Sequence, residues 1–341
     1  MSPPWAVEKN RPAAIVLLEA AKITMSVSVV MSVYDGQEFL TPSIESVLRQ
    51  TYTDFEFVIV DDGSRDGSPA ILDDYARRDP RIRVMHQENR GLAASLNLAI
   101  ERARHDLIVR MDSDDLMLPC RLQHQVEFMA EHPSVSVACS FTELIDRDGR
   151  KIATSRPVVD VDRGRRERDA KWFVEIVHPS VIMRRAHFLS VGGYRSDYKF
   201  AEDRELWGRF VTSGYRIEVI PETLLRYRLH GDSMSTRDMA RNDLICRYID
   251  HNIERRLSGK ADIELEEFCE WRTQLPLSAK VSDSFRSSKL LYYKKATRHF
   301  AERRWLQFVG CFTLATALAP YSTAKRALTK LLVRPADQSH L

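Results

Sequence analysis

Three short runs of apolar and β-branched residues recur in the first third of the chain, and each stops at polar residues. The runs are Val27–Tyr34, Phe55–Val60 and Leu107–Met111. Runs of this length that end at a turn are typical of buried strands. Between them, apolar residues recur at helical spacing, which predicts helices from about Phe39 to Arg49, Pro69 to Arg78 and Leu92 to Ala103.

Strands that alternate with helices in this way predict a parallel sheet with right-handed crossovers. After about residue 235 the sequence instead reads as helices rich in Arg and Glu. We therefore expect an α/β fold, in which a Rossmann-like, mostly parallel sheet is flanked by helices and followed by a helical C-terminal extension.

Acidic residues follow two of the predicted strands directly. Asp61 and Asp62 end one strand, and Asp112, Asp114 and Asp115 end another. Ligands of open α/β sheets bind outside the carboxyl ends of the strands, so these clusters should converge on one edge. A hard cation such as Mg²⁺ or Mn²⁺ relieves the repulsion among carboxylates and leaves positions for phosphate oxygens. The alternative is a solvated acidic turn that caps the next helix.

Two further stretches have less specific patterns. His86–Gly91 contains Asn89 and a glycine directly before a predicted helix. Such a turn presents free N–H groups that suit a phosphate, although a plain helix start explains it equally well. From 140 to 175 the sequence is polar and includes the charge run Arg163–Arg168. We expect an exposed, mobile loop there.

A carboxylate lies on the apolar stripe of the predicted helix Ala201–Phe210. Leu206, Trp207 and Phe210 follow Asp203 by three, four and seven positions, so Asp203 shares their buried face in the first turn. The helix N-terminus would stabilise its charge in a purely structural role. A general base aimed into a cleft is the functional alternative.

A basic cluster follows in the alternating stretch Leu224–His230, which predicts a strand. Arg226, Arg228 and His230 share one face of it. Two guanidinium groups and an imidazole attract phosphate or carboxylate groups, although pairing with surface acids would also occupy them.

Composition limits the class of protein. The 341 residues are 44% hydrophobic and 29% charged, with a net charge of +3, as in an ordinary globular protein of one large or two small domains. That charge is too small to indicate a nucleic-acid partner. The five cysteines are scattered without a C-x-x-C pair, which argues against a zinc site or a disulfide framework and suggests a reducing cytosol.

Both ends of the chain carry apolar segments. Ala13–Leu18 is soon interrupted by Glu19 and Lys22, so we treat residues 1–24 as an N-terminal appendage rather than a signal peptide. Phe308–Ala319 is too short to span a bilayer, which takes about 20 residues. We expect a buried helix of a C-terminal bundle, with a membrane-interface helix as the alternative, because basic residues flank the segment. They are Arg303, Arg304, Lys325, Arg326, Lys330 and Arg334.

Taken in order, the motifs between residues 25 and 232 resemble those of the family 2 glycosyltransferases, which have the type-A nucleotide-sugar-binding fold. The motifs are Val27–Gly36, Gln50–Ser64, Asn89–Gly91, Asp112–Asp115, Gly192–Tyr194, Glu202–Asp203 and Arg226–His230. The resemblance implies a catalytic domain over 25–235, with a nucleotide-binding half to residue 140 and an acceptor and catalytic half after it. Residues 236–341 would form a helical C-terminal region.

The resemblance also implies roles for particular residues. Those that would contact the nucleotide-sugar donor are Ser32, Tyr34, Asp61, Asp62, Asn89, Gly91, Asp112, Ser113, Asp114, Arg226 and Arg228. Asp114, Asp112 and His230 would approach a Mn²⁺ or Mg²⁺ ion, and Asp203 would be the catalytic base. The implied reaction is an inverting transfer from a nucleotide-diphosphate sugar, with UDP as the first expectation. The implied acceptor is a glycan or lipid-linked glycan at the cytosolic membrane face, in surface polysaccharide or lipopolysaccharide synthesis.

Two other functions stay open at the level of sequence. A sugar nucleotidyltransferase also uses a parallel sheet and acidic metal ligands, but it usually needs a Gly-rich basic loop after the first strand, and Tyr34–Glu38 offers none. An inactive sugar-nucleotide-binding scaffold would have no need of Asp203 on an apolar stripe.

Overall fold

The computed structural model describes residues 25–160, 173–198, 200–230, 239–278 and 304–318, with isolated residues between 279 and 303. Three features noted in the sequence lie outside the described residues: the apolar stretch near the N-terminus, the charge run Arg163–Arg168, and the basic residues after 318.

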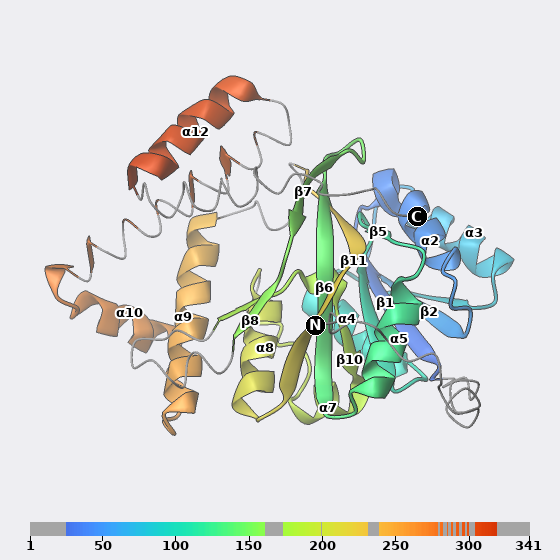
Figure 1. Cartoon of the computed structure of the whole chain (residues 1–341), viewed down its shortest axis with the longest axis horizontal. Helices are drawn as coiled ribbons and strands as arrows, with labels where there is room; N and C mark the ends of the chain where they lie inside the picture. The colour runs from blue at the N-terminus through green and yellow to red at the C-terminus, as the bar shows by residue number, and fades with distance from the viewer. Residues whose placement is uncertain are drawn as a thin grey trace, which may run out of the picture.

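A nine-stranded sheet runs through the centre of the described chain (Figure 1). Its order is β3-β2-β1-β4-β10-β6-β11-β5, and β7 pairs with β6 outside this path. The strands are β1 (Val27–Val33), β2 (Phe55–Asp61), β3 (Ile82–His86), β4 (Leu107–Asp112), β5 (Leu116–Met117), β6 (Val135–Ile145), β7 (Lys151–Ser155), β10 (Ile182–Arg184) and β11 (Arg216–Arg228). A separate pair is formed by β8 (Val158–Asp160) and β9 (Phe173–Glu175).

The predicted parallel half of the sheet is confirmed. Strands β3, β2, β1 and β4 run parallel, with Val30 of β1 in register with Val58 and Arg110 on its two neighbours. The short strand β10 lies antiparallel between β4 and β6, and β11 runs parallel to β6. The carboxyl ends of β1, β2 and β4 therefore meet at one edge, as the sequence predicted.

Helices cover both faces of the sheet. They are α2 (Gln37–Leu48), α3 (Ser68–Arg78), α4 (Leu92–Arg102), α5 (Arg121–Glu131), α7 (Arg185–Ser190), α8 (Glu202–Thr212), α9 (Met239–Leu257), α10 (Leu265–Thr273) and α12 (Trp305–Leu318). One core contains the β1 residues Val29 and Met31 with side chains of α2 and α5, and the other contains Val30 with side chains of α4, α8 and α9. The alternation along β1 assigns successive residues to opposite cores, which is the period-2 pattern of a strand buried on both faces.

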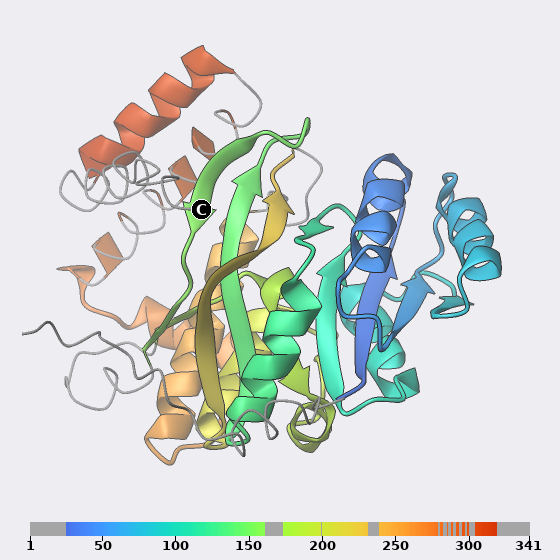
Figure 2. The same cartoon turned by 45° about the vertical axis from the view of Figure 1, so that its right-hand side comes forward.

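The expectation of a mobile loop over residues 140–175 was wrong for the described part. Strand β6 continues through Ile145, turns at Gly149 and returns as β7, and β8 follows at once (Figure 2). Leu144 and Ile145 are buried, whereas Lys151 and its neighbours on β7 lie at the sheet edge. The polar character of this stretch comes from the turn and from β7, which pairs only with β6 within the described sheet and is partly exposed.

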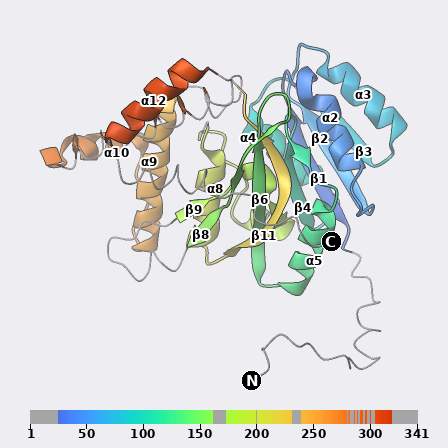
Figure 3. The same cartoon turned by 45° about the horizontal axis from the view of Figure 1, so that its top comes forward.

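The C-terminal helices lie on the side of the molecule away from α2 and α3 (Figure 3). Helix α9 packs on α8 through Ile249 and Ile253, which belong to the same core as Leu206. Within the described residues, no helix combines the length and the apolar character needed to cross a bilayer. In helix α12, Leu306 is 88% exposed and Val309 is 57% exposed. The expectation of a buried helix was therefore wrong for these residues.

Candidate active site

Three carboxylates gather where β4 ends. Asp112, Asp114 and Asp115 each offer an oxygen, and these oxygens lie within 4.8 Å of one another. Asp112 closes the strand, Asp114 lies in the following turn, and Asp115 is fully buried beneath them. Burial raises the pKa of Asp115 well above its usual range, and the charges of Asp114 and Asp112 raise it further. The structure thus brings together Asp112 and Asp114, the two carboxylates among the three predicted metal ligands, and adds Asp115.

The triad fits a hard divalent cation. Oδ1 of Asp115 accepts the Arg228 N–H at 2.8 Å, while its buried Oδ2 has no hydrogen-bond partner among the described residues. An unpartnered buried carboxylate oxygen beside two further acids is costly unless a cation neutralises it. Oxygen ligands are those that Mg²⁺ and Mn²⁺ prefer. His230 approaches the same place, with Nε2 2.9 Å from Oδ2 of Asp114.

Arg110 is a site residue that the sequence reading missed. It lies on β4 two residues before Asp112, is 2% exposed, and forms an ion pair with the Asp112 carboxylate. Its charge opposes the rise in the pKa of Asp112 that burial causes. The sequence did contain a signal for this residue, namely an arginine inside an otherwise apolar strand. Such a residue is rarely buried without a partner.

The basic segment divides between two places. Arg228 is buried, and its guanidinium donates to the carbonyls of Asp114, Asp146 and Arg147. The Phe39 ring of α2 lies 4.6 Å from this guanidinium and 5.2 Å from the His230 ring. Arg226 is exposed and pairs with Glu143 across the β6–β11 ladder at 2.9 Å. Arg228 and His230 are therefore brought to the acidic triad, and Arg226 is occupied by Glu143.

Asp62 at the end of β2 organises the adjoining loop. Its carboxylate is 2% exposed and accepts the N–H groups of Arg90 and Gly91 at 2.8 Å and the side-chain amide of Gln87 at 2.7 Å. Gly91 has a φ of 88°, a conformation that glycine adopts without strain. The interpretation of this turn as a free phosphate cradle is thereby corrected, since Asp62 holds two of its N–H groups. Asn89 is exposed.

The neighbouring acid, Asp61, binds side chains of the same edge. Its Oδ2 lies 2.8 Å from Nδ1 of His86, and its Oδ1 accepts the Ser64 N–H at 3.1 Å. Asp61 raises the pKa of His86 by hydrogen bonding, with Asp73 on the other ring nitrogen adding to the effect. Asp61 therefore acts here as a partner of His86 and of the loop.

The remaining predicted donor residues include three at the same carboxyl edge of the sheet, Ser32, Tyr34 and Ser113. Ser32 of β1 is in register with Asp112, and Tyr34 follows at the strand end, half exposed. Ser113 places its Oγ 3.2 Å from where a Cβ on Gly36 would lie, so the β4 turn closely approaches the start of α2. A flat exposed ring beside a polar edge is suited to stacking on a nucleotide base.

Asp203 lies in the first turn of α8 on the face of Leu206 and Trp207, as predicted. The Arg204 N–H donates to its Oδ1 at 2.7 Å, and burial raises the pKa of Asp203. The charge of Asp203 also raises the pKa of Asp112, so the two carboxylates lie close enough to influence each other. Burial and Asp203 together raise the pKa of Glu202 to about 7.

A buried network fixes the turn that precedes α8. The Asn97 side chain on α4 exchanges two 2.8 Å hydrogen bonds with the Tyr194 backbone, and the Tyr194 hydroxyl lies 2.6 Å from Nε2 of His178. Burial lowers the pKa of His178 well below its usual value, with Arg110 adding to the effect. His178 also escaped the sequence reading, because a lone histidine carries no spacing signal.

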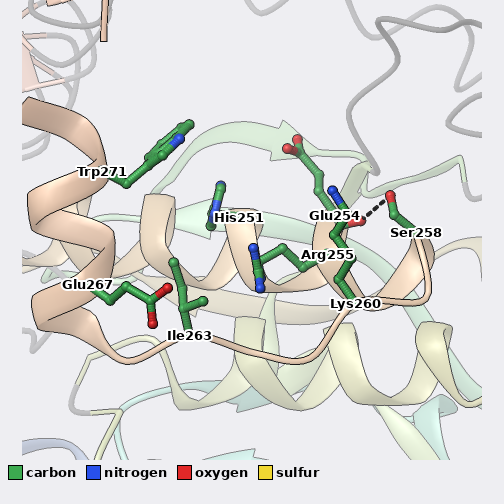
Figure 4. A pocket seen from close by; sticks show the side chains of 8 residues that line it. All are labelled: His251, Glu254, Arg255, Ser258, Lys260, Ile263, Glu267 and Trp271. Carbon is green, nitrogen blue, oxygen red and sulfur yellow. Dashed lines mark hydrogen bonds between the residues drawn. The ribbon is translucent and has the colours of Figure 1, made fainter. Parts of the chain in front are cut away.

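A separate pocket of about 290 Å³ opens between α9 and α10 (Figure 4). His251 and Arg255 of α9 face Glu267 and Trp271 of α10 across it. The rings of His251 and Trp271 are in contact, with centroids 4.4 Å apart and a tilt of 35° between them. This pocket involves none of the predicted site residues.

Comparisons with known proteins identify the family of this chain. The family model "Glycosyl transferase family 2" matches residues 28–188. "Putative glycosyltransferase EpsE" of Bacillus subtilis is 34% identical over 215 residues, which cover 62% of this chain and 76% of that protein. "Amylovoran biosynthesis glycosyltransferase AmsE" of Erwinia amylovora is 30% identical over 213 residues, or 62% of this chain and 79% of that protein.

Solved structures show the same fold. S. aureus TarS 1–349 in complex with UDP-GlcNAc aligns with a TM-score of 0.53 at 16% identity, covering 88% of this chain and 92% of that one. The mannosyltransferase PcManGT from Pyrobaculum calidifontis, in complex with GDP-Man and Mn²⁺, aligns with a TM-score of 0.51 at 18% identity, covering 91% and 81%. At such identities the likeness concerns the fold.

A mixed α/β sheet with an acidic cluster at the carboxyl end of β4 defines, together with these relatives, a glycosyltransferase of the type-A fold. The chain belongs to glycosyltransferase family 2. The nucleotidyltransferase and inactive-scaffold alternatives are set aside by this membership.

Proposed function

We propose that this enzyme transfers a sugar from a nucleotide-diphosphate donor, with UDP as the nucleotide, to an acceptor hydroxyl with inversion of configuration. The observation that carries the proposal is the cluster of Asp112, Asp114 and Asp115 at the end of β4, with Asp203 in the first turn of α8 acting on the pKa of Asp112. A general base must stand within reach of the acceptor while the donor diphosphate lies at the acidic triad. A carboxylate in the first turn of α8, close enough to act on the pKa of Asp112 at the end of β4, supports this arrangement.

In the proposed reaction, Asp203 accepts the proton of the acceptor hydroxyl, which attacks the anomeric carbon from the face opposite the diphosphate. Asp114 and Asp112 would hold a Mn²⁺ or Mg²⁺ ion, with His230 beside Asp114. The ion supplies positive charge that stabilises the departing diphosphate. Arg228 holds the Asp114 turn in place, and Arg226 would have to leave Glu143 in order to reach a phosphate.

The nucleotide end of the proposed donor site lies between β1 and β2. Tyr34 would stack on the base, with Ser32 and Ser113 near the ribose. Asp62 and Asp61 would face the base edge, and Asn89 and Gly91 would border it from the start of α4. One lone pair of Oδ2 of Asp62, which accepts a single hydrogen bond from Gly91, could accept the uracil N3–H.

The proposed acceptor is a glycan or lipid-linked glycan in cell-envelope polysaccharide synthesis. Two relatives support this class by name: the amylovoran enzyme AmsE, and the O-antigen biosynthesis glycosyltransferase WbnJ of Escherichia coli, which is 29% identical over 222 residues. Such acceptors are held at the cytoplasmic face of the membrane. Helix α12 would contact that surface through Leu306, Val309 and Leu314, which are all exposed.

Thermal unfolding with UDP, GDP and dTDP, each with and without Mn²⁺, tests the donor site. A ligand at 100 times its Kd stabilises the native state by about 2.7 kcal/mol, which raises Tm by several degrees. We expect this shift with UDP only when Mn²⁺ is present. No shift with any diphosphate would contradict the donor and metal proposals.

Donor hydrolysis and transfer assays with Asp203→Asn test the base. General-base catalysis contributes typically about 10²–10⁴-fold, so we expect turnover to fall by that factor while UDP still raises Tm. Full turnover in Asp203→Asn would refute the base assignment. The anomeric configuration of the product, read by NMR, tests inversion.

Co-sedimentation with phosphatidylcholine vesicles, with and without phosphatidylglycerol, tests the membrane contact. We expect binding that increases with the anionic lipid and is lost in the double variant Leu306→Asp, Val309→Asp. Equal recovery in the supernatant with both vesicles would refute the membrane role of α12.

A further inference from the structure

We propose that α9, which lies beyond the segment matched by the family model, positions the base Asp203 through a bidentate ion pair between Asp250 and Arg204. The inference rests on the proposed role of Asp203. It makes Asp250 and Arg204 positioning residues and joins the C-terminal helices to the catalytic machinery. The boundary at residue 235 would then not separate two functional units.

The Asp203 carboxylate has little support from other side chains. Within the described residues its hydrogen bonds come from local backbone N–H groups, above all that of Arg204, the next residue along. No side chain caps the start of α8, where Glu202, Asp203 and Glu205 place three acids in the first turn. The direction of the Asp203 side chain therefore depends on where the first turn of α8 is held.

Helix α9 holds that turn from outside. Nε and Nη2 of Arg204 donate to the two oxygens of Asp250 at 2.7 and 3.0 Å. This is the fork-to-fork geometry that fixes both the distance and the plane of the partners. The pair is about 30% exposed on either side, so water competes for it only in part. Arg204 thus binds the Asp203 carboxylate through its backbone N–H and binds Asp250 of α9 through its side chain.

Two further contacts from α9 bracket the same turn. The Tyr248 ring stacks on Tyr198, which precedes α8, with centroids 5.9 Å apart and the rings 9° from parallel. Nη2 of Arg256 lies 3.5 Å from Oε1 of the buried Glu205. Helix α9 therefore contacts Tyr198 before Asp203, Arg204 directly after it, and Glu205 one residue further on. A displacement of about 1 Å at a reacting group can cost as much as 100-fold in rate, so this bracket bears directly on turnover.

The opposite side of α9 offers a built-in control. Asp250, Ile253 and Arg256 recur every three residues and face α8. His251 and Arg255 face the α9–α10 pocket instead, where Glu267 of α10 projects from the other wall (Figure 4). Removing the charge of Glu267 changes the same C-terminal region without touching the bracket.

The test compares Asp250→Asn, Asp250→Glu and Glu267→Gln in the full-length protein. Measured quantities are kcat and KM for donor hydrolysis, and the Tm shift on adding UDP and Mn²⁺. We expect Asp250→Asn to lower kcat by about 10- to 100-fold while KM for the donor and the UDP-induced Tm shift stay unchanged. Asp250→Glu should recover much of the loss, and Glu267→Gln should behave as wild type.

Unchanged kcat in Asp250→Asn would overturn the inference. So would a loss of kcat matched by an equal loss of donor binding, because that pattern marks a general structural defect. If Asp250→Asn is insoluble, Arg204→Lys keeps the charge but not the fork, and the same selective loss of kcat is expected. Failure of the proposed function looks different, since wild type itself would then release no UDP or Asp203→Asn would retain full turnover.

Discussion

The buried Arg110 forms an ion pair with Asp112, which lies two residues later on the same face of β4 and whose side chain is 26% exposed. The pair places a fixed positive charge directly beneath the acidic triad, where burial alone would raise the pKa of Asp112. Nε of Arg110 has no hydrogen-bond partner among the described residues, so the acids of the site provide most of the compensation for this buried charge. The Arg110 guanidinium and the acidic triad therefore stabilise each other.

Replacing Arg110 with methionine should destabilise the fold strongly. The substitution keeps an apolar stem of similar length but leaves the acids without their buried counter-charge. Breaking one partner of a buried pair costs about 3–5 kcal/mol in the free energy of unfolding. Urea denaturation measures this directly. Arg49→Met is the control, because the Arg49–Glu45 pair is exposed and should contribute less than about 1 kcal/mol. Equal effects of the two substitutions would contradict this account of Arg110.

The raised pKa of Glu202 predicts that the free energy of unfolding depends on pH. Burial and the charge of Asp203 raise its pKa to about 7 in the folded protein, above the usual value of 4.5. The folded state therefore binds this proton more tightly than the unfolded state does. The stabilising contribution is complete below about pH 4.5 and is lost as the pH rises through about 7.

Glu202→Gln removes that titration and keeps the side-chain shape. We expect the variant to be more stable than wild type at pH 8, by up to about 3 kcal/mol, and to lose this advantage at pH 4. Urea unfolding at both values measures the difference. A stability difference that is the same at both pH values would show that Glu202 does not titrate in this window.

The parallel half of the sheet could be predicted from the sequence because its signals are local. Val27–Val33 and Phe55–Asp61 are mostly apolar runs bounded by turns, and helical spacing marks the crossovers between them. Asp203 was also placed correctly, since its face follows from three apolar neighbours on one helix. At these places the period and length of the apolar pattern were sufficient to predict the element and its buried face.

The remaining features depend on pairings distant in sequence. The polar hairpin β6–β7 read as a loop because nothing local reveals that β6 pairs with β11 about 80 residues later. The amide groups of Arg90 and Gly91 looked free because their partner, Asp62, lies about 28 residues earlier. The bracket from α9 likewise joins residues 46 apart in the chain.

Asp115 should separate the effects of metal binding from those of folding. It is buried, its pKa is raised, and one of its oxygens has no partner in the described part of the chain. Asp115→Asn removes a repelled charge, so without metal the variant should be no less stable than wild type. Its Tm increase on adding Mn²⁺ with UDP should be reduced to near zero. A full Mn²⁺-dependent increase in this variant would exclude Asp115 from the metal site.

Phe39 links α2 to Arg228 and His230. Its half-buried ring lies 4.6 Å from the Arg228 guanidinium and 5.2 Å from His230, so it supports both beside Asp114. A cation over an aromatic face gains about 0.5–1 kcal/mol where solvent reaches it and about 2 kcal/mol where it is desolvated. Phe39→Leu keeps the apolar bulk and removes the aromatic face.

We expect Phe39→Leu to raise KM for the donor by about 3- to 10-fold, the equivalent of about 0.7–1.4 kcal/mol, with kcat nearly unchanged. The loss falls on KM because the ring orients residues around the bound diphosphate and does not touch the acceptor. Phe39→Tyr keeps the face and should bind donor as wild type does. Phe128→Leu, which removes a ring stacked on His132, is the matched control and should leave KM unchanged. Should Phe39→Leu bind the donor as tightly as Phe39→Tyr, Arg228 and His230 would be held by their hydrogen bonds alone.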